Sequence, residues 1–182
     1  LLPLEVEGME RVDPNTSYVF VANHQGSFDI FLIYAVLGRN FKWMMKKELR
    51  KVPFIGKACD SARHIFVDNS TPRKTKETME KAKETLQGGT SLVVFPEGSR
   101  TFTGKMGVFK KGAYLLAAQI QLPIVPMTIE GSFDVLPRMK GISFVERHKL
   151  KLTLHRPIDS SDPTAALSQS RQIIEDSLKR DR

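Results

Sequence analysis

Segments typical of β-strands alternate with segments typical of α-helices along almost the whole chain of 182 residues. Short apolar runs indicate buried strands, and longer stretches with apolar residues three or four positions apart indicate helices. The expected strands cover residues 17–22, 41–45, 64–67, 90–95, 123–129 and 149–155, and the expected helices residues 30–37, 71–86, 113–119 and 164–179. This alternation predicts an α/β fold: a single domain over residues 1–182, with a mixed, largely parallel sheet flanked by helices.

The clearest helical signal lies in residues 71–86. Thr71 is a suitable N-cap, Pro72 fits the first helical position, and Gly88 with Gly89 would end the helix. No internal repeat, low-complexity tract or interdomain linker interrupts the pattern.

A histidine and an aspartate, His24 and Asp29, directly follow the first expected strand. On a continuous helix, side chains five positions apart diverge by about 140°. The two can therefore meet only in a turn that opens a helix, as Gly26 and the capping candidate Ser27 indicate. His24 would then be a general base whose tautomer Asp29 fixes. Alternatively, Asp29 is a helix-start carboxylate and His24 a hydrogen-bonded loop residue. Residues 22–29 alone leave both interpretations open.

A second polar motif, Phe95-Pro96-Glu97-Gly98-Ser99-Arg100, directly follows the strand expected at residues 90–95. Gly98 permits a tight turn, Ser99 can donate a hydrogen bond, and Arg100 can bind a phosphate or carboxylate with two N–H groups. Glu97 could orient Arg100 or bind a substrate hydroxyl. A turn carrying a surface Glu–Arg pair is the alternative. Sites in open α/β sheets lie at the carboxyl ends of strands, so we expect both motifs at one sheet edge.

The chain carries 28 Lys and Arg against 20 Asp and Glu. This excess is compatible with nucleic acid, an anionic membrane, a phosphorylated substrate or a solvated basic surface.

Cys59 is the only cysteine, so an intrachain disulfide and a cysteine-based metal cluster are excluded. No apolar stretch reaches the roughly 20 residues that span a bilayer. Because the chain starts at Leu1 without a methionine, we expect an N-terminal, membrane-associating segment to be missing.

Taken together, the motifs resemble those of the glycerolipid acyltransferase family. Residues 23–29 match its NHxxxxD signature, and residues 95–100 resemble its FPEGTR block with serine in place of threonine. Residues 122–127 are similar to its hydrophobic fourth block, and residues 47–56 and 109–113 to its connecting segments. The resemblance covers residues 6–158, and the order and separation of the motifs make it specific.

The resemblance implies transfer of a fatty acyl group from a thioester to the sn-2 hydroxyl of lysophosphatidic acid, giving phosphatidic acid in phospholipid biosynthesis. His24 and Asp29 would be catalytic. The residues that the resemblance assigns to substrate binding are Asn23, Ser27, Phe66, Val67, Asp68, Glu97, Gly98, Ser99 and Arg100. Direct transfer is expected, because a positioned base needs no serine or cysteine nucleophile.

The chain departs from the family in one block. The family's second motif resembles GxxFIDR, and its arginine is taken as a phosphate ligand. The corresponding residues here run from Arg63 to Asn69, with arginine where glycine is usual and Asn69 where arginine is usual. Arg63, Arg73 or Lys74 could supply the charge instead, or the acceptor could be held less through its phosphate. The departure bears on the acceptor more than on the reaction type.

The resemblance also implies partners. The expected acyl donor is acyl-CoA or acyl-ACP, so that acyl carrier protein is a possible partner, and neither a metal nor another cofactor is expected. The protein would act on membrane lipids at the cytoplasmic face, peripherally or through an anchor, without binding nucleic acid. The alternatives are an acyltransferase for another lysolipid or for glycerol 3-phosphate, and a nonenzymatic basic membrane-binding module.

One further segment has two interpretations. Basic residues between Lys42 and Lys57 surround an apolar set, which consists of Trp43, Val52, Pro53, Phe54 and Ile55. Exposed, this combination would fit a membrane interface; otherwise the apolar residues belong to the core.

Overall fold

The computed structural model describes residues 2–68, 70–86, 88–136 and 145–180. Seven strands in this part of the chain form one sheet in the order β1-β7-β6-β2-β5-β3-β4. The strands are β1 (Leu4–Glu7), β2 (Val19–Ala22), β3 (Phe41–Lys46), β4 (Ile65–Val67), β5 (Ser91–Val94), β6 (Ile124–Glu130) and β7 (Leu150–Leu154). Every neighbouring pair is parallel except β6 with β7. The predicted mixed, largely parallel α/β fold is confirmed.

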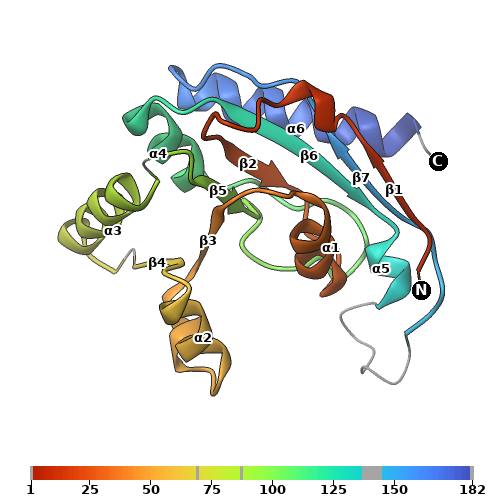
Figure 1. Cartoon of the computed structure of the whole chain (residues 1–182), viewed down its shortest axis with the longest axis horizontal. Helices are drawn as coiled ribbons and strands as arrows, with labels where there is room; N and C mark the ends of the chain where they lie inside the picture. Colours follow the sequence, from red (N-terminus) through yellow and green to blue (C-terminus); the bar gives the residue numbers. More distant parts are fainter. Residues whose placement is uncertain (1, 69, 87, 137–144, 181–182) are drawn as a thin grey trace.

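Helices pack on both faces of this sheet (Figure 1). The helices of the described residues are α1 (Phe28–Val36), α2 (Ile55–Ser61), α3 (Pro72–Thr85), α4 (Gly112–Ile120), α5 (Ser132–Val135) and α6 (Pro163–Arg180), with two 3-10 turns, η1 (Met9–Arg11) and η2 (Lys47–Lys51). Successive strand residues point to opposite faces. Phe20 therefore packs in a cluster with Leu32 and Ile33 of α1, whereas Val19 and Val21 belong to the cluster that contains residues of α3, α4 and α6.

The connections that follow β2 and β5 show where the strand order of the sheet reverses. After β2 the chain passes through α1 to β3 on one side, and after β5 it passes through α4 to β6 on the other side. These two adjacent strands therefore mark the point where the strand order reverses. Ligands of open α/β sheets bind beyond the carboxyl ends of strands at such a switch point.

The sequence located most of these elements. The predicted helix at residues 71–86 is α3, and the Thr71 side chain accepts from the Lys74 N–H as predicted for an N-cap. The prediction omitted β1, α2 and α5. These are short elements of four to seven residues, and β1 depends on pairing with β7, which lies nearly 150 residues away in the sequence. No helix in the described part of the chain has both the length and the apolar character that crossing a bilayer requires.

Candidate active site

The two polar motifs meet at the carboxyl ends of β2 and β5. The Glu97 carboxylate accepts the His24 N–H at 2.7 Å, and the His24 carbonyl accepts the Thr101 N–H at 3.0 Å. The Arg100 guanidinium donates to the Ser27 hydroxyl at 2.5 Å. The predicted convergence of the motifs at one sheet edge is therefore confirmed.

His24 and Asp29 form a hydrogen-bonded pair in the turn that opens α1. Nδ1 of His24 lies 2.7 Å from Oδ2 of Asp29. The same oxygen accepts the N–H groups of Gln25 at 2.7 Å and Gly26 at 3.0 Å. Ser27 occupies the N-cap position as expected, but its side chain makes no capping bond and accepts from Arg100 instead. A turn at the start of a helix thus brings together the two side chains that a continuous helix would separate.

The pairing of His24 with Asp29 determines the tautomer of the imidazole. An ionised carboxylate can only accept, so Nδ1 carries the proton and Nε2 presents a lone pair. No described residue hydrogen-bonds Nε2, and the His24 side chain keeps 13% of its surface exposed, whereas that of Asp29 has none. The ring stacks on Phe95 with centroids 3.9 Å apart and planes at 7°. The imidazole is therefore held in one orientation, with Nε2 left outside the hydrogen bonds of the described residues.

A residue that the sequence did not single out completes the support of Asp29. The Ser132 hydroxyl, at the start of α5, donates to Oδ1 of Asp29. α5 approaches the motif so closely that a Cβ on Gly26 would lie 2.6 Å from the Ser132 carbonyl oxygen. α5 follows the carboxyl end of β6, the other neighbour of β2. Only this position in the sheet identifies Ser132 as a partner of Asp29, and spacing along the chain does not give that position.

Glu97 joins the two loops of the site. Its second carboxylate oxygen accepts the Gly107 N–H at 2.6 Å, so that one oxygen holds the histidine motif and the other holds the loop before α4. Burial raises the pKa of Glu97, and the hydrogen bonds from Gly107 and His24 partly offset this effect. Both oxygens are thus occupied by backbone donors; binding of a substrate hydroxyl by Glu97 stays a prediction.

Cationic groups lie beside the turn at Gly98. This residue has a φ of 73°, and a Cβ there would lie 2.9 Å from the Lys110 ammonium. Ser99 is exposed at the same turn, and Arg100 follows it. A glycine at this position permits both the left-handed backbone and the close approach of the lysine. Together with Lys110, Arg100 gives one side of the site the positive charge that a phosphate requires.

Asn23 has a different environment from its neighbours in the motif. The residue is 1% exposed, and its amide accepts from the Ile129 N–H and donates to the Ile129 carbonyl, each at 2.8 Å. The side chain thereby ties the end of β2 to β6. A contact between Asn23 and substrate stays a prediction, since its polar atoms serve the backbone here.

The predicted residues Phe66, Val67 and Asp68 lie in or just after β4, at the edge of the sheet. β5 and β3 separate β4 from β2, the strand that His24 follows. β4 therefore lies three strand spacings, or about 14 Å, from β2. Asp68 accepts from Lys47 at 2.8 Å, and Lys74 lies 3.5 Å away. The hydrogen bond from Lys47 is the main cause that lowers the pKa of Asp68, and bonds from Ser70 add to it. Asn69 lies outside the described residues.

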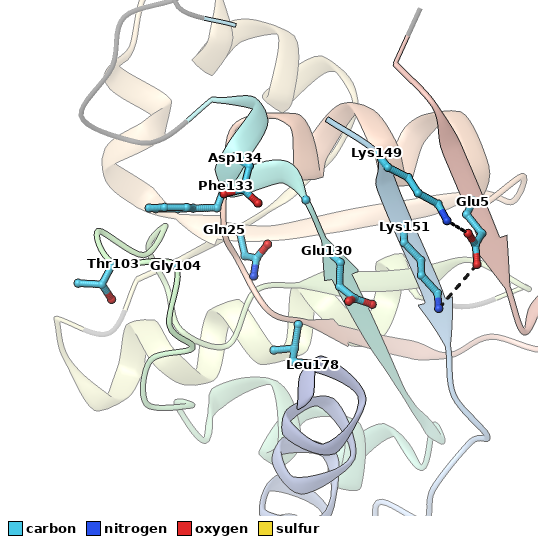
Figure 2. A pocket seen from close by; sticks show the side chains of 11 residues that line it. Glu5, Gln25, Thr103, Gly104, Glu130, Phe133, Asp134, Lys149, Lys151 and Leu178 are labelled. Atoms are coloured by element: carbon cyan, nitrogen blue, oxygen red, sulfur yellow. Dashed lines mark ion pairs between the residues drawn. The ribbon is translucent and has the colours of Figure 1, made fainter. Parts of the chain in front are cut away.

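A polar cavity of about 680 Å³ lies beside the motif, and neither His24 nor Asp29 lines it. Figure 2 shows it between the ends of β6, β7 and β1, with Gln25 as the histidine motif's contribution. Glu5 forms ion pairs with Lys149 and Lys151 across its wall. Arg100 is not among the lining residues either, so the cavity is separate from the place where the two motifs meet.

Three comparisons with known proteins show what the chain is similar to. The family model described as Acyltransferase matches residues 3–130. The chain is 30% identical over 177 residues to the chloroplastic 1-acyl-sn-glycerol-3-phosphate acyltransferase of Arabidopsis thaliana, covering 96% of this chain and 49% of that protein. It is 37% identical over 132 residues to the alpha form of Ovis aries, covering 72% and 46%.

A solved structure shares the fold. The 1-acyl-sn-glycerophosphate acyltransferase of Thermotoga maritima matches with a TM-score of 0.82 and 26% identity, over 98% of this chain and 72% of that one. The chain spans about half the length of the curated relatives it matches.

Proposed function

Because the chain belongs to the Acyltransferase family, we propose that it transfers a fatty acyl group from an acyl thioester to the sn-2 hydroxyl of lysophosphatidic acid, forming phosphatidic acid. The observation that carries this proposal is the hydrogen bond of 2.7 Å between His24 Nδ1 and the buried Asp29 carboxylate. The relatives named above act, by their names, on 1-acyl-sn-glycerol 3-phosphate.

In this mechanism Nε2 of His24 removes the proton from the acceptor hydroxyl as the oxygen attacks the thioester carbonyl. The imidazolium is stabilised by Asp29. When the tetrahedral intermediate collapses, the carbon–sulfur bond breaks and His24 returns the proton to the departing thiolate. The ester bond forms directly, without an acyl-enzyme. A positioned base of this kind contributes typically about 10²–10⁴-fold.

The acceptor's phosphate is proposed to bind on the Arg100 side of the site. Arg100 and Lys110 lie beside the Gly98 turn, and Arg100 bonds Ser27, which is three residues from His24. A headgroup held here would bring its hydroxyl to the imidazole. The segment with Phe66, Val67 and Asp68 would then contact more distant parts of the acceptor.

The proposed substrates favour a reaction at a membrane surface. Each buried methylene favours the lipid phase by about 0.8 kcal/mol, so a chain of about fourteen methylenes favours it by roughly 11 kcal/mol. An enzyme that works at the interface avoids extracting such a chain into water. We propose association with the cytoplasmic face of a membrane, with acyl-CoA or acyl-ACP as donor and no other cofactor.

Acyl transfer from a labelled thioester to lysophosphatidic acid tests this function. We expect His24→Ala to lower kcat by about 10²–10⁴-fold. His148→Ala is the matched control, because His148 also contacts a carboxylate, Glu146 at 3.3 Å, but is exposed. Other lysolipids and glycerol 3-phosphate in the acceptor panel distinguish the alternative acceptors. Normal turnover by a folded His24→Ala protein would rule out the proposed base.

A further inference from the structure

The segment between β3 and α2 projects from the molecule. We call residues 46–57, which contain η2 and the first residues of α2, the η2–α2 projection. Every residue from 48 to 55 is exposed. Figure 1 shows α2 apart from the other helices, beyond the end of β3. Of the two interpretations of the sequence, burial holds for Trp43, whereas the apolar residues of the projection are exposed.

The tip of the projection is apolar. Phe54 is 92% exposed and Ile55 53%, and Leu49 and Val52 are exposed beside them. Scattered apolar residues are normal on a protein surface, but here four exposed ones lie within seven positions of one projecting segment.

The η2–α2 projection has a defined local conformation. The Ile55 N–H bonds to the Pro53 carbonyl at 2.7 Å across Phe54, whose φ of 62° and ψ of −47° give a γ-turn of the strained kind. Gly56 packs so closely on the turn before it that a Cβ would lie 2.0 Å from the Arg50 carbonyl oxygen. Arg50 in turn bonds Asp60 at 2.9 Å. A strained turn that presents a phenylalanine to solvent indicates a binding function.

Basic side chains surround the tip. Residues 46–57 contain five basic residues and one acidic residue, Glu48. Two of the five are paired with carboxylates, Lys47 with Asp68 and Arg50 with Asp60. Lys46, Lys51 and Lys57 are exposed and form no ion pair within the described part of the chain. An apolar tip with a cationic rim is complementary to a bilayer whose headgroups are anionic.

The projection lies at the same edge of the sheet as the catalytic pair. It begins where β3 ends, and β3 is parallel to its neighbour β5, whose carboxyl end carries Glu97 and Arg100. A membrane that contacts the tip therefore faces the edge at which His24 is presented. Lipids could then reach the site along the bilayer surface.

We propose that the η2–α2 projection docks on an anionic lipid bilayer, with Phe54 and Ile55 inserted among the acyl chains and Lys46, Lys51 and Lys57 against the lipid phosphates. This inference rests on the proposed function and identifies the surface through which it is exercised. A protein partner is disfavoured because the tip is small compared with the roughly 800 Å² per partner of a stable interface.

Co-sedimentation of the 182-residue chain with vesicles tests the proposal, using phosphatidylcholine alone and phosphatidylcholine mixed with phosphatidylglycerol. Phe54→Gly keeps the positive φ without strain, and it is combined with Ile55→Ser. We expect this double variant to weaken binding to mixed vesicles by about tenfold or more. Leu115→Ser is the matched control, since Leu115 on α4 is 50% exposed, and we expect it to bind normally.

A second pair of variants tests the charge. Lys51→Gln with Lys57→Gln should weaken binding to mixed vesicles by several-fold and leave binding to phosphatidylcholine unchanged. Lys76→Gln with Lys81→Gln, on the exposed side of α3, is the control. Unchanged vesicle binding by the Phe54 and Ile55 double variant would overturn the proposal. So would a dimer in solution that only this variant dissociates, because the tip would then bind a second copy of the chain.

Activity on water-soluble substrates separates this proposal from the proposed function. With a short-chain thioester and a short-chain acceptor below its critical micelle concentration, the projection variants should turn over normally. They should be slow only on vesicles. If the unmodified chain turns over neither soluble substrates nor substrates in vesicles, yet binds vesicles through the tip, the acyl-transfer function fails and the docking surface stands.

Discussion

Two regions at the same edge of the sheet are held in different ways. At the ends of β2 and β5, the His24–Asp29 pair lies within a buried network in which Asp29 accepts from His24, Gln25, Gly26 and Ser132. At the ends of β3 and β4, the polar contacts are ion pairs of partly exposed side chains, among them Lys47 with Asp68 and Arg50 with Asp60.

The difference corresponds to the role that we propose for each region. A general base works only when its lone pair points at the reacting proton, so its support has to be rigid and shielded from water. A surface that contacts lipid headgroups needs charge and reach, and exposed ion pairs contribute little to stability. Substitutions in the first region should therefore reduce catalysis strongly, and those in the second should change stability little.

The largest effect is expected for Asp29→Asn. The N–H groups of Gln25 and Gly26 favour the amide oxygen opposite Nδ1, so the variant keeps the tautomer and loses the negative charge that stabilises the imidazolium. We expect kcat to fall by up to about 10⁴-fold, the loss that the equivalent change causes in a serine protease triad. Steady-state kinetics measures the loss, and nitrogen NMR of the imidazole reports the tautomer.

Glu146→Gln is the control for this change, because it alters the exposed His148–Glu146 pair in the same chemical way. It should leave kcat unchanged. A folded Asp29→Asn protein with unimpaired kcat would show that the Asp29 charge does not support His24 as a base.

Ser132→Ala should have an intermediate effect. It removes one of the hydrogen bonds to the Asp29 carboxylate without touching substrate. A bond to a charged group is worth about 1.5–3 kcal/mol, so we expect kcat to fall by about tenfold while KM changes less than about twofold.

Ser170→Ala controls for the loss of a buried serine. Its hydroxyl bonds the Tyr114 hydroxyl at 2.7 Å on the opposite side of the sheet. This variant should lose comparable stability and keep its kcat. Equal kcat losses in both variants would make Ser132 a packing residue only.

Ser132 also illustrates what the sequence could and could not predict. His24 and Asp29 are five positions apart, and the turn that joins them is encoded locally by Gly26. Ser132 lies 103 positions from Asp29 and reaches it only because β6 pairs with β2. A contact that depends on strand order cannot be read from spacing along the chain.

The same limit applies to Asn23 and the η2–α2 projection. The sequence placed Asn23 in the catalytic motif, but its pairing with Ile129 requires the β2–β6 register. The basic and apolar residues of the projection were evident, but whether the apolar ones were buried depended on how α2 packs. Strands and helices with strong periodicity were predictable because local pattern decides them.

A smaller effect, on stability, is expected from the β3–β4 side. The His64 side chain is buried; Nδ1 accepts the Trp43 N–H at 3.2 Å, and Nε2 lies 3.1 Å from the Tyr34 hydroxyl. Burial, and then the charge of Lys42, lower the pKa of His64. Above the ordinary histidine pKa of about 6.5, both folded and unfolded chains hold it neutral. As the pH falls below that value the unfolded chain takes up the proton first, so stability decreases.

Thermal unfolding between neutral and mildly acidic pH measures this decrease. His64→Asn retains an acceptor near the Nδ1 position and does not titrate, so its melting temperature should depend less on pH. Some dependence should remain, because burial also lowers the pKa of His155 to about 4. An unchanged pH profile in His64→Asn would show that His64 does not contribute.

The smallest effect on stability is expected for Asp68→Asn. Asp68 lies between Lys47 at 2.8 Å and Lys74 at 3.5 Å, and all three side chains are partly exposed. Water and salt replace such ion pairs readily, so the melting temperature should stay within about 2 °C of the parent. The variant also leaves one more positive charge beside the η2–α2 projection, so binding to phosphatidylglycerol-containing vesicles should rise by up to a few-fold.

Asp29→Asn removes the same charge from the buried network. If Asp68→Asn lowered kcat as much as Asp29→Asn does, the β4 edge would belong to the catalytic network, and the division between the two regions would be wrong.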